Sequence, residues 1–269
     1  MRYDHNSSLQ RDHPLVPTSG FDNMEEYVGY LIHRMAYEEA VRMANGKPVL
    51  DWGCNNGYGL EIMRNLGCQN ISGIDTSPSA IAAARDRLGA DVPLYLFDGG
   101  QAPLPADSVP VITSFQCIEH VVDRDGFLQE IRRLLSPGGI LLMTTPNAAI
   151  RLDPGMKPWN EYHVTEFWPS QLLELTQEHF GDVDLRGLFG VHRLHQIEVT
   201  RCARARASAR GRGFSALLRR VTPMALKRLL KRHTDSGTRP SAEFTTADFH
   251  YRNDDLDSAL DLMAVCTKR

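Results

Sequence analysis

The sequence has few cysteines, no long apolar run and no apolar leader. Its five cysteines among 269 residues never form a C-x-x-C pair. This argues against a disulfide framework or a thiolate zinc site and favours a reducing compartment. No apolar run approaches the roughly 20 residues that span a bilayer, and the opening residues, MRYDHNSSLQRDHPLVP, contain no signal-peptide block. We therefore expect a cytoplasmic protein.

Acidic residues are absent from one stretch of the chain. Of the 30 lysines and arginines, eleven fall within residues 201–232, where there is no aspartate or glutamate. The remainder then carries 19 basic against 33 acidic residues, so a basic block stands beside an acidic body. Three roles are open for this block: a flap that closes over a substrate, a helix on an anionic membrane surface, or an RNA-binding patch. The sequence leaves open whether the chain forms a homo-oligomer.

Short apolar runs alternate with amphipathic stretches between residues 48 and 147, a pattern typical of a parallel sheet with crossover helices. The runs are 49–50, 71–74, 94–97, 109–115 and 140–143, and VDLRGLFGV and LDLMAVCTKR follow as a sixth and a last strand. Predicted helices are SPSAIAAARDRL, with Ser77 as cap and Pro78 in the first turn, DRDGFLQEIRRLL and WPSQLLELTQEHF. The expected fold is α/β, with a Rossmann-like, doubly wound sheet of seven strands.

The chain divides into four expected segments. Residues 1–46 form an N-terminal arm and a covering helix, MEEYVGYLIHRMAYEEAVRMA, and residues 47–200 form the core. Residues 201–256 form a basic lid or insertion before the last strand, and residues 257–269 close the core. Within the insertion, PMALKRLLKRH predicts an amphipathic helix from Pro223, and the polar residues 234–246 predict a loop.

The stretch VLDWGCNNGYG has the composition of a ligand-binding turn. A strand ends at Asp51, and Gly53 and Gly57 let the backbone pass close to a ligand before a helix begins. Asp75, 24 residues further on, ends the second strand and can accept both hydroxyl protons of a ribose. A nicotinamide dehydrogenase normally has G-x-G-x-x-G here, and Asp51 would repel its pyrophosphate. An amino-acid ammonium group would be attracted.

Five stretches, in order, resemble the motifs of class I S-adenosylmethionine-dependent methyltransferases: VLDWGCNNGYG, GIDTSP, FDGGQAPLPADSV, SFQCIEHV and RLLSPGGILLMTTPN. The resemblance implies an antiparallel last strand. It also implies that Asp51 and Gly53 line the methionine end of S-adenosyl-L-methionine. The family usually has glycine where Asn55 stands, but asparagine tolerates the left-handed backbone region. The implied cofactor site consists of Asp51, Gly53, Asn55, Asn56, Gly57, the ribose-binding Asp75 with Thr76, and Asp98 with Gly99 at the adenine.

The stretch SFQCIEHV, with the later NEYHVTEF, indicates the reacting centre. It is similar to two groups of methyltransferases that use a divalent ion, those of ubiquinone biosynthesis and the small-RNA 2′-O-methyltransferases, which carry E-x-x-E-H here. The resemblance implies a Mg²⁺ or Mn²⁺ site formed by Gln116, Glu119, His120 and His163, with Gln116 replacing the first acid. His120 or His163 is the expected general base. In the alternative, a metal-independent enzyme, the histidines only pack beneath the substrate.

Several classes of molecule could accept the methyl group. The whole-chain pattern looks most like bacterial enzymes of glycan and glycolipid pathways, which implies O-methylation of a sugar or glycan hydroxyl, such as a mannose- or glucose-containing polysaccharide precursor. The nearest alternative is a phenol, catechol or other natural-product methyltransferase. An RNA 2′-O-methyltransferase, a nicotinamide oxidoreductase and a non-catalytic cofactor-binding module are less favoured, so we do not expect a nucleic-acid partner. A lipid-linked acceptor would suit peripheral membrane contact through the basic insertion.

Overall fold

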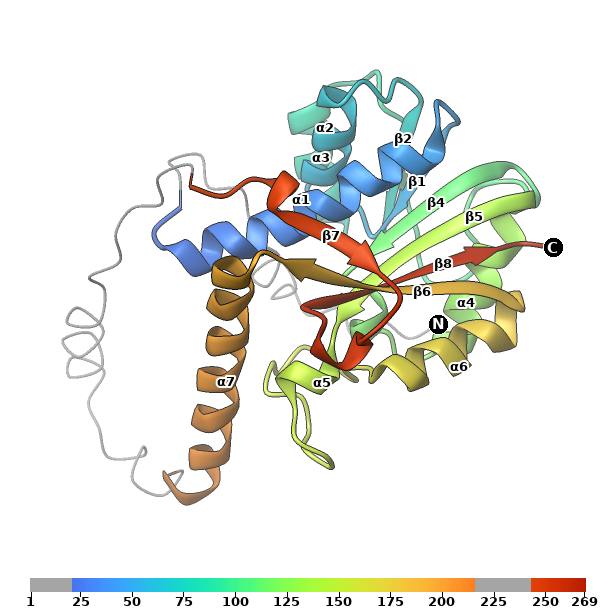
Figure 1. The fold of residues 1–269 in the computed structure, drawn as a ribbon. Helices are drawn as coiled ribbons and strands as arrows, with labels where there is room; N and C mark the ends of the chain where they lie inside the picture. The colour runs from blue at the N-terminus through green and yellow to red at the C-terminus, as the bar shows by residue number, and fades with distance from the viewer. Residues whose placement is uncertain (1–20, 216–242) are drawn as a thin grey trace.

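The computed structural model describes residues 21–215 and 243–269, the coloured parts of Figure 1. Three of the predicted elements lie outside these residues. They are most of the N-terminal arm, the amphipathic helix from Pro223, and the loop at 234–246 except for its last four residues.

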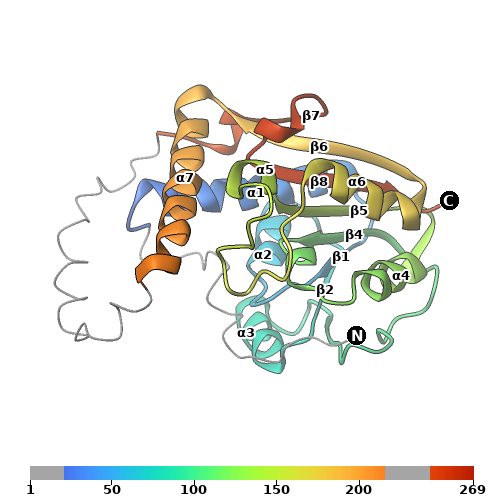
Figure 2. The same ribbon diagram turned by 90° about the horizontal axis from the view of Figure 1, so that it is seen from below.

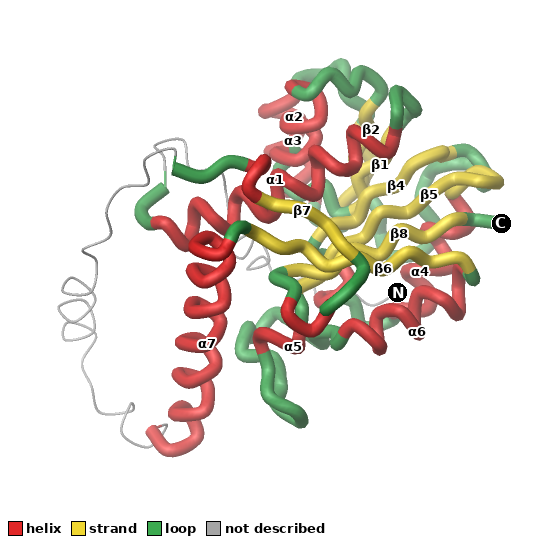
Figure 3. Tube along the Cα trace, in the orientation of Figure 1, coloured by secondary structure: helices red, strands yellow, loops and turns green. Residues whose placement is uncertain are grey.

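The described residues form one sheet in the order β3-β2-β1-β4-β5-β8-β6-β7 (Figures 1 and 3). β1 to β5 pair in parallel, whereas β8 lies antiparallel between β5 and β6. The α/β fold with an antiparallel last strand is therefore confirmed. The strands are β1 (Val49–Trp52), β2 (Ile71–Asp75), β3 (Leu94–Leu96), β4 (Val109–Phe115), β5 (Leu135–Pro146), β6 (Asp182–Gly190), β7 (Phe249–Arg252) and β8 (Asp261–Thr267).

The expected count of seven strands is wrong, because the described part of the sheet has eight. The additional strand, β7, pairs antiparallel with β6 from Phe249 to Arg252 and extends the edge of the sheet. It falls within 201–256, the stretch interpreted as a lid. Its sequence, FHYR, alternates apolar and polar side chains over only four residues, which is too short a run to distinguish a strand from a loop.

Helices cover both faces of the sheet. Val49, Val111 and Val265 face a core shared with α1 (Met24–Ala44), α2 (Tyr58–Asn65) and α3 (Pro78–Leu88). Leu50 and Ile112, one residue further along their strands, face the opposite core with α4 (Arg124–Leu134) and α6 (Pro169–Phe180). Alternate residues of one strand therefore serve two cores, which explains why these strands are apolar throughout.

The helix starts follow the local sequence. The Ser77 hydroxyl accepts a hydrogen bond from the backbone N–H of Ala80 at 3.2 Å, and Pro78 opens α3, as expected. Asp123 caps α4 in the same way, through the N–H of Gly126 at 3.0 Å. After α4 the SPGG sequence ends the helix but lies at the start of β5 rather than in a separate loop.

The last long helix, α7 (His192–Ser215), projects from the body beside α1 and α5 (Ala148–Arg151), as Figures 1 and 2 show. It carries the first arginines of the basic block. Arg204 pairs with Glu25 on α1, and Arg210 pairs with Asp153 after α5. These two arginines of the basic block are thus bound to acidic groups of the body. None of the described helices is long and apolar enough to cross a membrane.

Candidate functional site

The turn after β1 has the backbone conformation of a close-approach loop. Gly53, Asn55 and Gly57 all have positive φ, at 85°, 46° and 77°. A Cβ on Gly53 would lie 2.2 Å from the Sγ of Cys117, so no other residue fits there. Asn55 adopts the left-handed region that the sequence required of it. The Asn56 side chain accepts a hydrogen bond from the N–H of Tyr58 at 3.3 Å and so joins the turn to α2.

Asp51 is buried beneath this turn with 1% of its surface exposed. Its Oδ1 accepts a hydrogen bond from the Thr113 hydroxyl at 2.7 Å, and its Oδ2 accepts one from the Tyr37 hydroxyl at 3.4 Å. Burial raises the pKa of Asp51 to about 7, against both hydrogen bonds, which lower it. Within residues 21–215 and 243–269, no basic side chain forms an ion pair with it. A cationic ligand would supply the positive charge that these residues do not place beside Asp51.

The other predicted cofactor residues lie at the ends of β2 and β3. Asp75 accepts backbone hydrogen bonds from Asn55 and Ser77, both at 2.8 Å, and so ties the first turn to the second. Thr76, which follows Asp75 in the chain, is half-buried. Asp98 is exposed and accepts a hydrogen bond from the N–H of Gly100 at 2.9 Å, while Gly99 is buried with φ 90°. Because β1, β2 and β3 are parallel, these residues gather along one edge and fit an elongated nucleoside with a cationic end.

The covering helix contributes residues that sequence reasoning did not assign to the site. Tyr37 of α1 contacts Asp51 and fills the space above Gly59, where a Cβ would lie 2.0 Å from its ring. The hydroxyl of Tyr58 lies 3.0 Å from Nδ1 of His33, one turn earlier on α1. His33 therefore belongs to the contact between the covering helix and α2. The helical spacing of 33 and 37 was the available signal, but it is equally typical of core packing.

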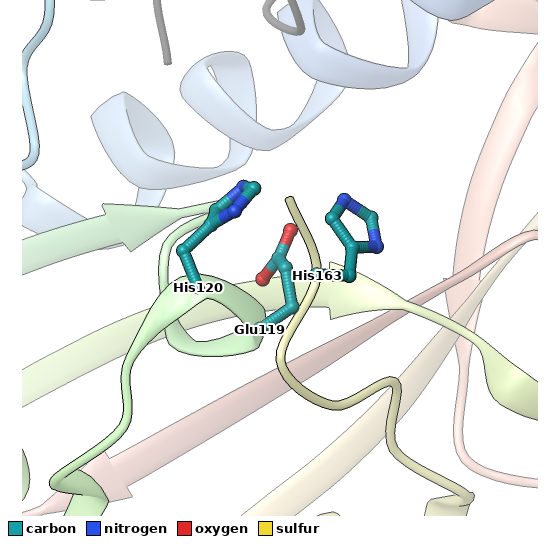
Figure 4. A group of neighbouring side chains, drawn as sticks. All are labelled: Glu119, His120 and His163. Atoms are coloured by element: carbon teal, nitrogen blue, oxygen red, sulfur yellow. The ribbon is translucent and has the colours of Figure 1, made fainter. Parts of the chain in front are cut away.

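The predicted acceptor residues Glu119, His120 and His163 come together, as Figure 4 shows, and the two imidazoles meet edge to face with ring centroids 4.9 Å apart, beside the Glu119 carboxylate. One ligand atom from each lies within 4.8 Å of the other two. Glu119 is 1% exposed, its Oε2 accepts a hydrogen bond from the Thr145 hydroxyl at 3.0 Å, and its Oε1 has no hydrogen-bond partner. A buried carboxylate oxygen without a donor is costly, and it points to a ligand at this position.

Both histidines are oriented through Nδ1. His120 Nδ1 lies 2.9 Å from the backbone oxygen of Tyr162, and His163 Nδ1 lies 2.7 Å from Oε1 of Glu166. These acceptors favour the tautomer with the proton on Nδ1, so Nε2 is the nitrogen that presents a lone pair. Histidines that bind metals are commonly held by a carboxylate or carbonyl in this way.

A loop anchored to the end of β4 brings His163 beside His120. The N–H groups of Val164 and Thr165 both donate to the backbone oxygen of Glu119, at 2.8 and 3.2 Å. The loop is further held by Glu166, on which Arg151 places two hydrogen bonds of 2.8 Å. Burial raises the pKa of Glu166, but the hydrogen bonds from His163 and Arg151 outweigh it and lower the pKa to about 2.

Gln116, the fourth predicted ligand, is turned toward a different partner. Its Nε2 lies 3.1 Å from each carboxylate oxygen of Asp261 and 3.2 Å from the Thr144 hydroxyl. Sequence reasoning missed Asp261, because it lies 145 positions away on β8. It also missed Arg151, and Glu166 was signalled only by its spacing of three residues from His163. The indole of Trp159 packs against the Arg151 guanidinium, whose Cζ lies 4.1 Å from the ring centroid.

The comparisons with known proteins concern the family and the fold. Residues 50–143 match the profile of a family described as a methyltransferase domain. A probable S-adenosylmethionine-dependent methyltransferase of Mycobacterium tuberculosis is 30% identical, over 88% of this chain and 82% of its own. A ubiquinone biosynthesis O-methyltransferase of Bradyrhizobium diazoefficiens is 35% identical, but over only 41% of this chain and 46% of its own.

Among solved structures, an S-adenosylmethionine-dependent methyltransferase of Thermotoga maritima matches with a TM-score of 0.52 at 14% identity, over 89% of this chain and 92% of its own. That likeness supports the fold alone. The mycobacterial relative covers most of both chains, and its family removes the oxidoreductase and the non-catalytic module as alternatives. The chain therefore belongs to the S-adenosylmethionine-dependent methyltransferases and is an enzyme of that family.

Proposed function

We propose that this enzyme transfers the methyl group of S-adenosylmethionine to a hydroxyl group of a sugar or glycan, with His120 or His163 accepting the proton. The observation that carries the proposal is the buried, unpartnered Oε1 of Glu119 beside two imidazoles whose Nδ1 atoms are already engaged. A hydroxyl group holds its proton at neutral pH. A site that methylates it therefore needs a base, a cation, or both.

The cofactor end contributes binding and orientation. The buried carboxylate of Asp51 suits the ammonium group at the methionine end, and Asp75 suits the ribose diol. The bound cofactor supplies a sulfonium that is already activated for methyl transfer. What this chain must add at that end is a fixed position for the methyl group, in line with the acceptor oxygen.

At the acceptor end, Glu119, His120 and His163 are the residues that would hold a Mg²⁺ or Mn²⁺ ion. Their ligand atoms, within 4.8 Å of one another, are close to the spacing that one ion spans. When bound, such an ion supplies Lewis-acid assistance that makes a nearby hydroxyl easier to deprotonate. Each Nε2 has one lone pair, so a histidine that binds the ion cannot also accept the proton. One histidine would serve as a ligand, and the other would take the proton of the hydroxyl as the oxygen takes the methyl group.

A sugar suits this site because neighbouring hydroxyl groups can approach a cation and a base together. A catechol has the same arrangement, so small-molecule phenol or catechol methylation is the second candidate. It is favoured by the similarity of part of this chain to ubiquinone biosynthesis O-methyltransferases. A glycan acceptor is favoured by the resemblance of the TTPN and YHVTEF stretches, and of the basic insertion, to glycan-pathway enzymes.

The test is transfer of a tritiated methyl group to panels of mannosides, glucosides, catechols and RNA. It uses the wild type and the Glu119→Gln, His120→Ala and His163→Ala variants. We expect sugar methylation in the wild type, a loss of roughly 10²-fold or more in at least one histidine variant, and unchanged binding of S-adenosylhomocysteine by calorimetry. His179→Ala is the matched control, because His179 sits in a separate group with Asp125 on the surface. Methylation of catechols but not sugars would overturn the acceptor, and full activity in both histidine variants would overturn the base.

The cation is tested separately by treating the enzyme with EDTA and then adding back Mg²⁺, Mn²⁺ or Zn²⁺ singly. We expect activity to fall with EDTA and to return with Mg²⁺ or Mn²⁺. Unchanged turnover in EDTA would remove the ion from the proposal while leaving the histidine base in place.

A further inference from the structure

Gln116 has a strained backbone conformation, and its side chain contacts Asp261. Its φ of 54° lies in the left-handed region, which non-glycine residues seldom adopt. In this conformation its Nε2 reaches both oxygens of Asp261 at 3.1 Å and the Thr144 hydroxyl at 3.2 Å. The amide nitrogen is thereby committed to β5 and β8, and the carbonyl oxygen, Oε1, is turned away from Asp261.

Asp261 lies at the reacting edge of the sheet although it is remote in sequence. It is the first residue of β8, and it pairs with Pro146, the last residue of β5. Because β8 runs antiparallel to β4 and β5, its start lies where those two strands end. Asp261 therefore shares an edge with Glu119, which follows β4.

Two carboxylates at this edge are buried without a counter-charge. Asp261 is 5% exposed and Glu119 is 1% exposed. In the part of the chain that the structure describes, no lysine, arginine or histidine forms an ion pair with either. Arg151, the cation with the closest influence on Asp261, is committed to Glu166. Burial raises the pKa of Asp261 well above its usual range, and the nearby Glu119 adds to the rise, so the charged form of this acid depends on something positive beside it.

We infer that Asp261 is the second acid of the proposed cation site, moved from the end of β4 to the start of β8, and that it acts through Gln116 as a positioning residue. In the E-x-x-E-H pattern an acid occupies the position that corresponds to 116. Here Gln116 occupies it, and the carboxylate of Asp261 accepts hydrogen bonds from the Gln116 amide. Asp261 fixes the amide so that Gln116 Oε1 is the end presented to a cation. It also supplies the negative charge that Gln116 lacks. This inference rests on the cation in the proposed function.

The experiment is a calorimetric titration of the full-length protein, saturated with S-adenosylhomocysteine, with Mn²⁺. It compares the wild type with Asp261→Asn, Gln116→Glu and the double variant Gln116→Glu/Asp261→Asn. We expect Asp261→Asn to weaken Mn²⁺ binding by at least tenfold. The double variant returns the charge to position 116, and we expect its affinity to come back within about threefold of the wild type. Asp257→Asn, at an exposed aspartate close to β8, is the control.

A purely structural role for Asp261 predicts something different. It would lower the melting temperature of Asp261→Asn without metal, and the double variant would not be rescued. We expect the melting temperature of Asp261→Asn in EDTA to stay level or rise, since the variant removes a buried acid whose charged form burial disfavours. Gln116→Glu should lower the melting temperature by placing two acids in contact.

Three outcomes overturn the inference: Mn²⁺ affinity unchanged in Asp261→Asn, a double variant as weak as the single one, or no binding of Mn²⁺ to the wild type. Mn²⁺ binding with the expected variant pattern, but without methylation of any sugar, would leave the inference standing and remove the sugar from the proposed function.

Discussion

At the cofactor end Asp51 is buried among neutral hydroxyl groups, whereas at the acceptor end Glu166 is buried between Arg151 and His163. The surroundings move the pKa values of these carboxyl groups in opposite directions, to about 7 for Asp51 and about 2 for Glu166. Glu166 has its counter-charge within the protein and serves to hold a loop. Among residues 21–215 and 243–269 Asp51 has none, which is the condition expected where a positively charged ligand enters.

The largest effect should follow from removing the counter-charge of Glu166. Arg151→Met leaves a fully buried carboxylate with one partner, and we expect the free energy of unfolding at pH 7 to fall by about 3–5 kcal/mol. Arg87→Met is the matched control, because the Arg87–Glu61 pair is half-exposed and should be worth less than about 1 kcal/mol. Chemical denaturation measures both. Equal, small losses of unfolding free energy in the two variants would show that burial of the Glu166 carboxylate does not make the loss of its partner more costly.

The second prediction concerns the acid without a counter-charge. Asp51→Asn should weaken binding of S-adenosylmethionine by roughly 100-fold at pH 8, since a buried carboxylate facing an ammonium group is lost. In the wild type, affinity should fall as the pH drops below about 7, the pKa of Asp51 in the cofactor-free protein. The variant should lose this part of the pH dependence. Calorimetry between pH 5.5 and 8.5 measures both, and a flat wild-type profile would contradict the assignment.

The raised pKa of Asp51 also makes the stability of the cofactor-free protein depend on pH. Between about pH 4 and 7 the folded protein keeps a proton on Asp51 that the unfolded chain has released. Stability without cofactor is therefore lost as pH rises through this window, and Asp51→Asn should be more stable than the wild type at pH 8 but not at pH 4. Glu166 has the opposite sign: its lowered pKa adds stability above about pH 4.5, which is lost as pH falls toward 2.

The contrast between the two ends also explains what the sequence predicted. The cofactor turn is local: Asp51, Gly53 and Asn55 lie within five residues, and Asp75 follows at the spacing that one strand–helix–strand unit imposes. Such spacings can be read from the chain without knowledge of the folded sheet. The capped helix starts at Ser77 and Asp123 are local in the same sense, and they too were predictable or nearly so.

The acceptor end combines residues that only the folded sheet brings together. Glu119 and His120 share a motif, but His163 approaches them through a loop whose anchor is the backbone oxygen of Glu119. No side-chain pattern encodes such a contact. Asp261 reaches Gln116 because β8 inserts between β5 and β6, so its role depends on sheet order. The strand β7 escaped prediction for a related reason, since four residues gain strand structure only from pairing with β6.

A smaller effect should come from the covering helix, which belongs to the cofactor end although its residues were not predicted there. Tyr37→Phe removes the long hydrogen bond of 3.4 Å to Asp51, and we expect a loss of about 0.5–1.5 kcal/mol in cofactor binding. Because this bond lowers the pKa of Asp51, its removal should also move the fall in affinity to higher pH. Tyr27→Phe, also on α1, is the control, since its hydroxyl donates to the backbone oxygen of Phe244 and not to Asp51. Equal effects in both variants would assign the loss to packing of the covering helix.

The smallest effect separates the backbone of the cofactor turn from its side chains. Asn55→Gly keeps the N–H that donates to Asp75 and places at φ 46° the residue that adopts this region most readily. We expect stability and S-adenosylhomocysteine affinity to change by less than about 1 kcal/mol. Asn55→Ala, which forces a Cβ into the left-handed region without any polar group, should cost about 1 kcal/mol more than glycine. Thermal unfolding and calorimetry compare the three proteins. A tenfold loss of affinity in the glycine variant at unchanged stability would mean that the Asn55 side chain itself binds the cofactor, and the turn would then owe its function to more than its backbone.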